Sequence, residues 1–209
     1  MTQPGQSDYF ANHAKARRFP WTLYHRPLER DLARFLTGVH GTVLVVGCGL
    51  LHELDVAPPG VQFVVADVDA RAVAAVLERD DPRIVEGLVV PPEAALDFPH
   101  RFDAIYAKEV VEHVLAWPTW LTGLRRSLVP GGQLWLSTPN YGEPWLPALE
   151  STVLELVARK DGFTRRDIHP TRFTRRALDR GLRSTGFEDV DVNVTPTRLA
   201  LTAWARAPR

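Results

Sequence analysis

The sequence contains a single cysteine, Cys48, among its 209 residues. One thiol excludes an intrachain disulfide and a metal site built from several cysteines. No segment is apolar and long enough to suggest a membrane span. The polar N-terminal residues lack the basic and then apolar pattern of a secretory signal. We therefore expect a cytoplasmic protein with no membrane partner and an unknown oligomeric state.

The chain also lacks an excess of charge of either sign, because 25 Lys and Arg residues balance 25 Asp and Glu residues. Proteins that hold nucleic acids through phosphate contacts usually carry a basic excess, so no nucleic-acid partner is expected. The C-terminal third is nevertheless locally basic. We expect a solvated face there, with an anionic substrate group as the alternative. The residues concerned are Arg159, Lys160, Arg165, Arg166, Arg172, Arg175, Arg176, Arg180 and Arg183.

An apolar run at residues 43–46 leads directly into Gly47-Cys48-Gly49. Such a run is typical of a buried parallel strand, and paired glycines allow a backbone to approach a ligand closely. A second apolar run, residues 61–66, ends in Asp67, twenty residues after Gly47. A carboxylate at that strand end can accept hydrogen bonds from both hydroxyls of a ribose. These features predict a cofactor that contains adenosine.

Strand and helix patterns alternate along the chain. Further strands are predicted at residues 83–87, 102–107 and 133–137, and Pro130-Gly131-Gly132 is expected to turn the chain into the last of these. Helical spacing of apolar residues begins at Pro27 and recurs from Trp117 to Leu128. This alternation predicts an α/β fold.

The expected helix ends and the chain's last strands complete this pattern. Asp69 and Thr174 are expected helix N-caps, and Gly186 an expected helix end. Residues 187–194 and 198–205 are predicted to form an antiparallel hairpin.

Two further segments carry a resemblance to a known family. They are Phe102-Asp103-Ala104-Ile105-Tyr106-Ala107-Lys108-Glu109-Val110-Val111-Glu112-His113-Val114 and Leu128-Val129-Pro130-Gly131-Gly132-Gln133-Leu134-Trp135-Leu136-Ser137-Thr138-Pro139-Asn140. In this order, after the glycine loop and Asp67, the chain resembles the class I S-adenosylmethionine-dependent methyltransferases. The likeness is greatest to the group that includes quinone-biosynthesis and small-molecule methyltransferases.

The resemblance implies a doubly wound, mostly parallel seven-stranded sheet with one antiparallel strand. It implies S-adenosyl-L-methionine as cofactor, S-adenosyl-L-homocysteine as product and a small-molecule, possibly anionic, methyl acceptor. The residues expected to bind the cofactor are Gly47, Cys48, Gly49, Asp67, Val68, Glu93, Lys108 and Glu109. Glu86 is the alternative to Glu93 as the partner of adenine.

His113 and His169 are the candidate catalytic residues, because a histidine can deprotonate a nucleophile near neutral pH. A purely loop-fixing role is the alternative for each. Glu109 and His113 are four residues apart and would share a face if that segment were helical. No pattern of metal ligands is evident in the sequence, so no metal is expected.

Two positions depart from the family pattern: Val45 stands where an acid is usual, and Leu51 where a third glycine is usual. His52 and Glu53 could replace the lost acid, although a solvated helix face is the main expectation for them. These departures keep two alternatives open. One is a cofactor-binding partner subunit without activity, and the other is a nicotinamide-dependent oxidoreductase.

The domain organisation expected from the sequence has two parts. Residues 1–40 are predicted to form an N-terminal helical lid. Residues 41–209 are predicted to form the methyltransferase domain, with a substrate-side insertion at about 141–173.

Overall fold

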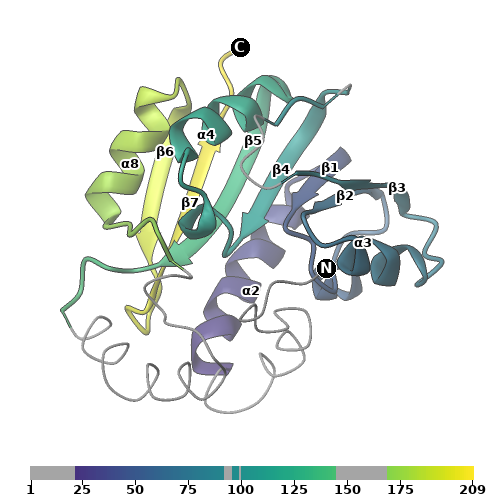
Figure 1. Cartoon of the computed structure of the whole chain (residues 1–209), viewed down its shortest axis with the longest axis horizontal. Helices are drawn as coiled ribbons and strands as arrows, with labels where there is room; N and C mark the ends of the chain where they lie inside the picture. The colour runs from purple at the N-terminus through teal and green to yellow at the C-terminus, as the bar shows by residue number, and fades with distance from the viewer. Residues whose placement is uncertain (1–21, 92–95, 99, 145–168) are drawn as a thin grey trace.

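The computed structural model describes residues 22–91, 96–98, 100–144 and 169–209. Its centre is a seven-stranded sheet in the order β3-β2-β1-β4-β5-β7-β6 (Figure 1). The strands are β1 (Gly41–Val46), β2 (Val61–Asp67), β3 (Ile84–Val89), β4 (Phe102–Lys108), β5 (Leu128–Pro139), β6 (Glu188–Val194) and β7 (Ala200–Arg206). Strand β7 pairs antiparallel with both its neighbours, and all other pairs are parallel. The predicted fold class is confirmed.

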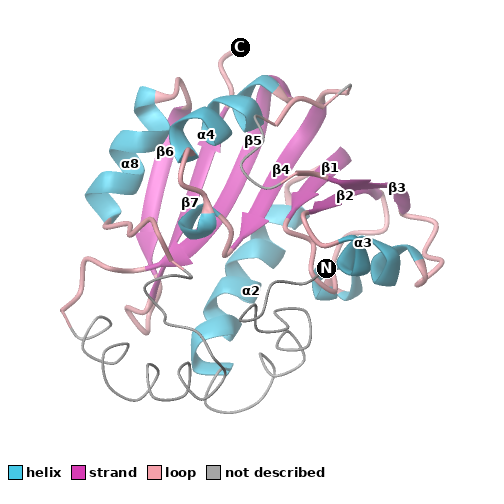
Figure 2. Cartoon of the chain, viewed as in Figure 1, coloured by secondary structure: helices cyan, strands magenta, loops and turns pink. Residues whose placement is uncertain are grey.

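Helices cover both faces of this sheet (Figure 2). Helices α4 (Trp117–Arg126) and α8 (Arg175–Ser184) pack on one face, and α2 (Thr22–Thr37) and α3 (Ala70–Leu77) pack on the other. Two short 3₁₀ helices, η2 (His52–Asp55) and η3 (Val111–His113), follow β1 and β4. None of the described helices combines the length and apolar character needed to cross a membrane.

The central strands supply both hydrophobic cores because neighbouring residues of a strand point to opposite faces. In β1, Leu44 and Val46 face α4 and α8, whereas Val43 and Val45 face α2 and α3. All four are buried. This two-sided burial explains why the strand reads as a continuous apolar run rather than an alternating one.

The predicted caps and hairpin are confirmed. The side chain of Asp69 accepts a hydrogen bond from the backbone of Arg71 at the start of α3, and that of Thr174 accepts one from Ala177 at the start of α8. Gly186 follows α8 with φ of +87°. Strands β6 and β7 form the expected antiparallel pair.

Several predicted boundaries were wrong, including that of the strand predicted at residues 133–137, which is β5 (Leu128–Pro139). Helix α2 begins at Thr22 and includes Pro27; the buried stripe of Leu28, Leu32, Phe35 and Leu36 offsets the cost of an internal proline, about 3 kcal/mol. The third strand ends at Val89 rather than at residue 87, since Leu88 and Val89 continue its pairing with β2.

Leu128 belongs to β5, not to the preceding helix. The backbone N–H and the hydroxyl of Ser127 both donate to the carbonyl of Gly123, and α4 ends at Arg126. Leu128 then pairs with Phe102. The predicted turn at residues 130–132 lies inside β5. The pairing register between β4 and β5 shifts there, and Gly131 has φ of +74°.

Helix α2 is fixed to the sheet by a shared acceptor. The indole N–H groups of Trp135 and Trp204 donate to the same carboxylate oxygen of Asp31, at 2.9 and 3.0 Å. The ring of Phe35 packs edge-on against Trp204. Of the predicted N-terminal lid, residues 1–21 lie outside the described residues, as do residues 145–168 of the predicted insertion. Both domain assignments stay predictions.

Candidate active site

The loop after β1 is built against the end of β2. The backbone N–H groups of Gly47 and Cys48 both donate to the carbonyl of Ala66, at 2.8 and 3.3 Å. Gly47 has φ of +73° and Gly49 has φ of +50°. A Cβ on Gly47 would lie 2.4 Å from a methyl carbon of Val110, so this position has no room for a side chain. The predicted glycine loop is therefore a tight, left-handed turn beside the segment that follows β4.

Asp67 holds the same loop from the end of β2. One carboxylate oxygen accepts the N–H of Gly49 and the other accepts the N–H of Asp69, each at 3.0 Å. Asp69 caps α3 with its own carboxylate, so Asp67 is not the helix cap. Val68, between the two acids, has an exposed side chain (58%). Asp67 thus stands at the carboxyl edge of the sheet, where open α/β sheets bind their ligands.

Leu51 occupies the position where the family pattern has a third glycine. Its backbone is left-handed, with φ of 48° and ψ of 51°, and its side chain is buried. The turn keeps the conformation that glycine adopts most easily, at a strain of about 1–2 kcal/mol for leucine. The core contacts of the leucine side chain offset this strain, because Leu51 belongs to the cluster that also contains Val45.

Glu53 is buried and forms an ion pair with Lys108 at the end of β4. Burial alone would raise the pKa of this carboxyl, but the Lys108 ammonium and its hydrogen bond outweigh that effect and lower the pKa. The expectation of a solvated face was wrong for Glu53, because the tight 3₁₀ turn of η2 directs it inward. A carboxylate is therefore present behind the loop although Val45 is apolar.

Cys48 is a packed residue of this loop, 5% exposed. Burial raises the pKa of its thiol, and the nearby Asp67 carboxylate raises it further. A thiol held in its neutral form is a poor nucleophile. The contribution of Cys48 to the site is therefore its backbone, which hydrogen-bonds to Ala66.

Glu109 faces α2 rather than His113. The hydroxyl of Ser137 donates to one of its carboxylate oxygens at 2.8 Å, and the hydroxyl of Tyr24 donates to the other. Burial raises the pKa of Glu109 in spite of these two hydrogen bonds and of Lys108. Its φ of +58° interrupts the chain after β4, so Glu109 and His113 do not share a helical face.

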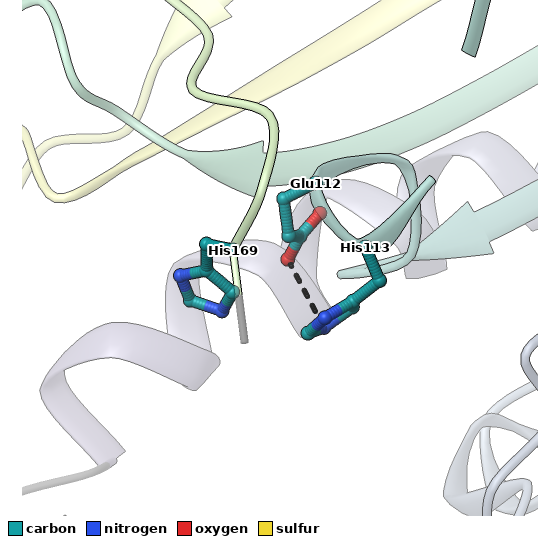
Figure 3. Close-up of side chains that lie close together, drawn as sticks. All are labelled: Glu112, His113 and His169. Carbon is teal, nitrogen blue, oxygen red and sulfur yellow. Dashed lines mark ion pairs between the residues drawn. The ribbon is translucent and has the colours of Figure 1, made fainter. Parts of the chain in front are cut away.

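The two candidate histidines lie side by side although 56 positions separate them in the sequence (Figure 3). Their ring centroids are 5.0 Å apart. The loop that carries His169 is tied to η3, because the Thr171 N–H donates to the carbonyl of Glu112 and the Thr171 hydroxyl donates to that of Val114. The structure thus brings together the two residues that the sequence named separately.

Glu112 lies between these histidines and is only 1% exposed. One of its carboxylate oxygens is 4.0 Å from Nε2 of His113. Burial, followed by repulsion from Glu109, raises the pKa of Glu112 well above its ordinary value. Tyr141 completes the group, with its hydroxyl 2.7 Å from Nδ1 of His169.

The sequence interpretation gave neither Tyr24 nor Glu112 a catalytic or cofactor-binding role. An acid among Val110, Val111 and Val114 is a signal that could have identified Glu112, since an isolated charge in an apolar run needs a partner. No local signal identifies the contact between Tyr24 and Glu109, which are 85 positions apart. Glu93 lies outside the described residues, and Glu86, the alternative to it, lies within β3.

The basic residues of α8 lie beside β6, at the opposite end of the strand order from β2 and β3. Arg175, Arg176, Arg180 and Arg183 line a surface hollow of about 830 Å³ between α8 and β6. Arg183 pairs with Asp179, and Arg175 donates to a backbone carbonyl of β6. These contacts fit the expected solvated face.

Comparison with known proteins decides the family. The methyltransferase domain family matches residues 18–192, which is most of the chain. The chain belongs to this methyltransferase family. Its methyl donor is therefore S-adenosyl-L-methionine, as the family resemblance implied. No curated protein matches the sequence.

Several solved structures share the fold of this methyltransferase. A complex between the Haloferax volcanii Trm112 methyltransferase activator and a methyltransferase matches at 16% identity and a TM-score of 0.68, covering 98% of this chain and 99% of that one. The N-methyltransferase NodS of Bradyrhizobium japonicum WM9, in complex with S-adenosyl-L-homocysteine, matches at 18% identity and a TM-score of 0.65. The match covers 98% of this chain and 100% of that one. The [4+2]-cyclase SpnF matches at 20% identity and a TM-score of 0.64, covering 91% of this chain and 83% of that one.

The residues present in this methyltransferase fit the cofactor. Gly47 and Gly49 leave the loop without side chains where a ligand must approach the backbone. Asp67 places a carboxylate at the adjoining strand end, and its position fits the hydroxyls of a ribose. Glu53 and Lys108 add a fixed pair of opposite charges behind the loop.

Proposed function

We propose that this methyltransferase transfers the methyl group of S-adenosyl-L-methionine to a nucleophilic oxygen, nitrogen or carbon of a small molecule. The observation that carries the proposal is the position of two groups of residues at one edge of the sheet. The loop of Gly47 to Gly49 and Asp67 lies at the ends of β1 and β2. The cluster of Glu112, His113 and His169 lies beyond the end of β4.

The cofactor half of this site consists of the glycine loop, Asp67 and their neighbours. Asp67 binds the ribose hydroxyls, and Glu93 accepts the adenine amine. Val68, Lys108 and Glu109 line the remaining surface. When bound, the cofactor supplies a methyl group on a positively charged sulfur, which a nucleophile can attack in line. The protein contributes mainly by aligning the two reactants, a role that supplies much of the rate enhancement in bimolecular reactions.

The acceptor half is formed by the histidine cluster. His113 or His169 takes the proton from an acceptor hydroxyl or amine, and Tyr141 holds the His169 ring through Nδ1. Helix α2 adds Tyr24 to the wall of the site through its contact with Glu109. This supports the proposal that residues 1–40 form a lid, which would exclude water from the transfer.

Two measurements test this function. Titration calorimetry with S-adenosyl-L-homocysteine should give one binding site per chain, and the absence of heat at millimolar ligand would overturn the proposal. Turnover is measured as S-adenosyl-L-homocysteine released in the presence of panels of phenols, amines and carbon acids. Ligand that co-purifies with the protein, identified by mass spectrometry, would narrow the acceptor class.

A partner subunit without activity of its own is a second candidate function. The left-handed Leu51 and the apolar Val45 favour it, because both depart from the family pattern at the cofactor loop. Binding of S-adenosyl-L-homocysteine without turnover on any acceptor would support this alternative. Membership of the methyltransferase family argues against a nicotinamide-dependent oxidoreductase, and quenching of protein fluorescence by NADH would revive that idea.

A further inference from the structure

Glu112, His113 and His169 each point one ligand atom toward a common region, and these three atoms all lie within 4.8 Å of one another (Figure 3). Zinc bonds to histidine nitrogen and carboxylate oxygen are about 2.0–2.2 Å long, which separates tetrahedral ligand atoms by roughly 3.4 Å. The His113 and Glu112 atoms are already 4.0 Å apart. Small side-chain rotations therefore suffice to bring all three atoms to bonding distance of one ion.

A second observation concerns the burial of Glu112. Within the part of the chain that the structure describes, its Oε2 atom is buried and has no hydrogen-bond partner. Leaving such an oxygen without a partner is unfavourable, and more so if it is charged. His113 lies against the other oxygen, Oε1, so a cation that binds both carboxylate oxygens would remove this cost.

A third observation concerns the second ring nitrogen of His169. Ligating histidines almost always bond through their other ring nitrogen to a fixed polar group. His169 has such a contact, because Nδ1 lies 2.7 Å from the Tyr141 hydroxyl. The guanidinium of Arg172 lies 5.1 Å from the centroid of the Tyr141 ring and packs over it. The ring that would bind through Nε2 is thus held in position.

We propose that Glu112, His113 and His169 bind a divalent transition-metal ion on the acceptor side of the site. Two imidazoles and one carboxylate suit Zn²⁺, Mn²⁺, Fe²⁺ or Co²⁺ better than Mg²⁺. Three protein ligands leave at least one coordination position open, as in catalytic rather than structural sites.

The open coordination position of the metal ion indicates the class of methyl acceptor. This inference rests on the proposed function. An acceptor hydroxyl bound there has a lowered pKa and releases its proton to solvent. Its oxygen then forms the bond to the methyl carbon, while the carbon–sulfur bond breaks and its electron pair goes to sulfur. The proposal therefore favours an oxygen acceptor over nitrogen or carbon. In this arrangement His113 and His169 are ligands rather than general bases.

Metal binding is tested on full-length protein stripped with EDTA and titrated with Zn²⁺ by calorimetry. One ion should bind per chain. Glu112→Gln and His169→Ala should each weaken binding at least 100-fold, and Tyr141→Phe, which removes only the contact to Nδ1, about 10- to 100-fold. His40→Ala is the matched control, since His40 is exposed and precedes β1, and its affinity should equal that of the wild type. Equal affinity of all four variants, or no binding by the wild type, would overturn the site.

The open coordination position needs its own measurement. The Co²⁺-loaded protein should show visible absorption bands that shift when acetohydroxamate, an oxygen-donor ligand, is added. Unchanged bands would show a closed site and would overturn the acceptor assignment. S-adenosyl-L-homocysteine is titrated into the same preparations. Cofactor binding without metal binding would contradict the metal site alone, whereas metal binding without cofactor binding would contradict the proposed function alone.

Discussion

Asp67 accepts the backbone N–H of Gly49 at 3.0 Å, and this hydrogen bond joins the end of β2 to the loop after β1. The second oxygen of the same carboxylate accepts the N–H of Asp69. The carboxylate is therefore held in place from both sides before any ligand binds. Such preorganisation reduces the ordering cost of binding, so Asp67 has two contributions: it shapes the loop and it presents acceptor oxygens at the sheet edge.

Replacing Asp67 by alanine should weaken S-adenosyl-L-homocysteine binding by roughly 1–3 kcal/mol, or about 5- to 150-fold, because charged hydrogen bonds are lost. Calorimetric titration measures the change. Asp69→Ala is the matched control. It removes the cap of α3 and should cost about 0.5–2 kcal/mol of stability while leaving the affinity intact. Unchanged affinity in Asp67→Ala would show that the ribose lies elsewhere.

Gly47→Ala tests the closeness of the loop to the segment after β4. The new Cβ would lie 2.4 Å from a Val110 methyl carbon, and φ of +73° is unfavourable for alanine. We expect a loss of about 2–3 kcal/mol in unfolding free energy by urea titration, together with weaker cofactor binding. Gly60→Ala is the control, because nothing lies within 4 Å of its added Cβ.

Val110→Ala separates the two causes of the stability loss in Gly47→Ala, which are the close contact with Val110 and the unfavourable backbone φ. In the double variant the contact with Val110 is relieved but the backbone strain is not. About half of the lost stability should therefore return relative to the sum of the single variants. Full additivity of the two single variants would contradict the contact with Val110.

The parts of this molecule that sequence predicts well are those set by neighbouring residues. The apolar run before Gly47 makes a buried strand in any α/β protein, and Asp69 and Thr174 cap helices through N–H groups two and three residues ahead. Asp67 was recognisable because strand length and crossover length fix its spacing from the glycine loop. The close backbone approach expected at Gly47 and Gly49 agrees with their positive φ.

The active-site contacts that sequence did not predict join distant segments. Glu53 and Lys108 are 55 positions apart, and Tyr24 and Glu109 are 85 apart. Neither pair has a periodicity or a spacing that could reveal it. Glu53 in particular was expected to be solvated, since a charged residue on a short turn usually is. Its burial depends on Lys108 at the end of β4, and only the order of strands in the sheet brings the two together.

Asp31→Ala should destabilise the attachment of α2 to the sheet. The variant leaves the indole N–H groups of Trp135 and Trp204 without their shared acceptor, and each orphaned donor costs about 1–3 kcal/mol when buried. We expect a loss of roughly 2–4 kcal/mol in unfolding free energy, with a change in tryptophan fluorescence. Asp179→Ala removes a solvent-facing acid paired with Arg183 and should change stability by no more than about 0.5 kcal/mol. A loss in Asp31→Ala no larger than this control would mean that water replaces the carboxylate.

Glu53→Gln should lower stability in a manner that depends on pH. Lys108 holds the pKa of the folded Glu53 carboxyl below its usual value of 4.5, although burial opposes this. A carboxyl with a lowered pKa stabilises the fold fully above its unfolded pKa, and this stabilisation is lost as pH falls through the folded pKa. At pH 7 the variant should therefore be less stable than the wild type by about 1–3 kcal/mol, as judged by urea unfolding.

The pH dependence of this difference identifies its cause. The gap between wild type and Glu53→Gln should be constant from pH 7 down to about 5 and should shrink in more acidic solution, where the wild-type carboxyl takes up its proton. Glu78→Gln is the control, because Glu78 is exposed at the end of α3 and its replacement should change stability at pH 7 by no more than about 0.5 kcal/mol. A gap that stays the same from pH 7 to pH 3 would show that Glu53 stabilises the loop by packing rather than by its charge.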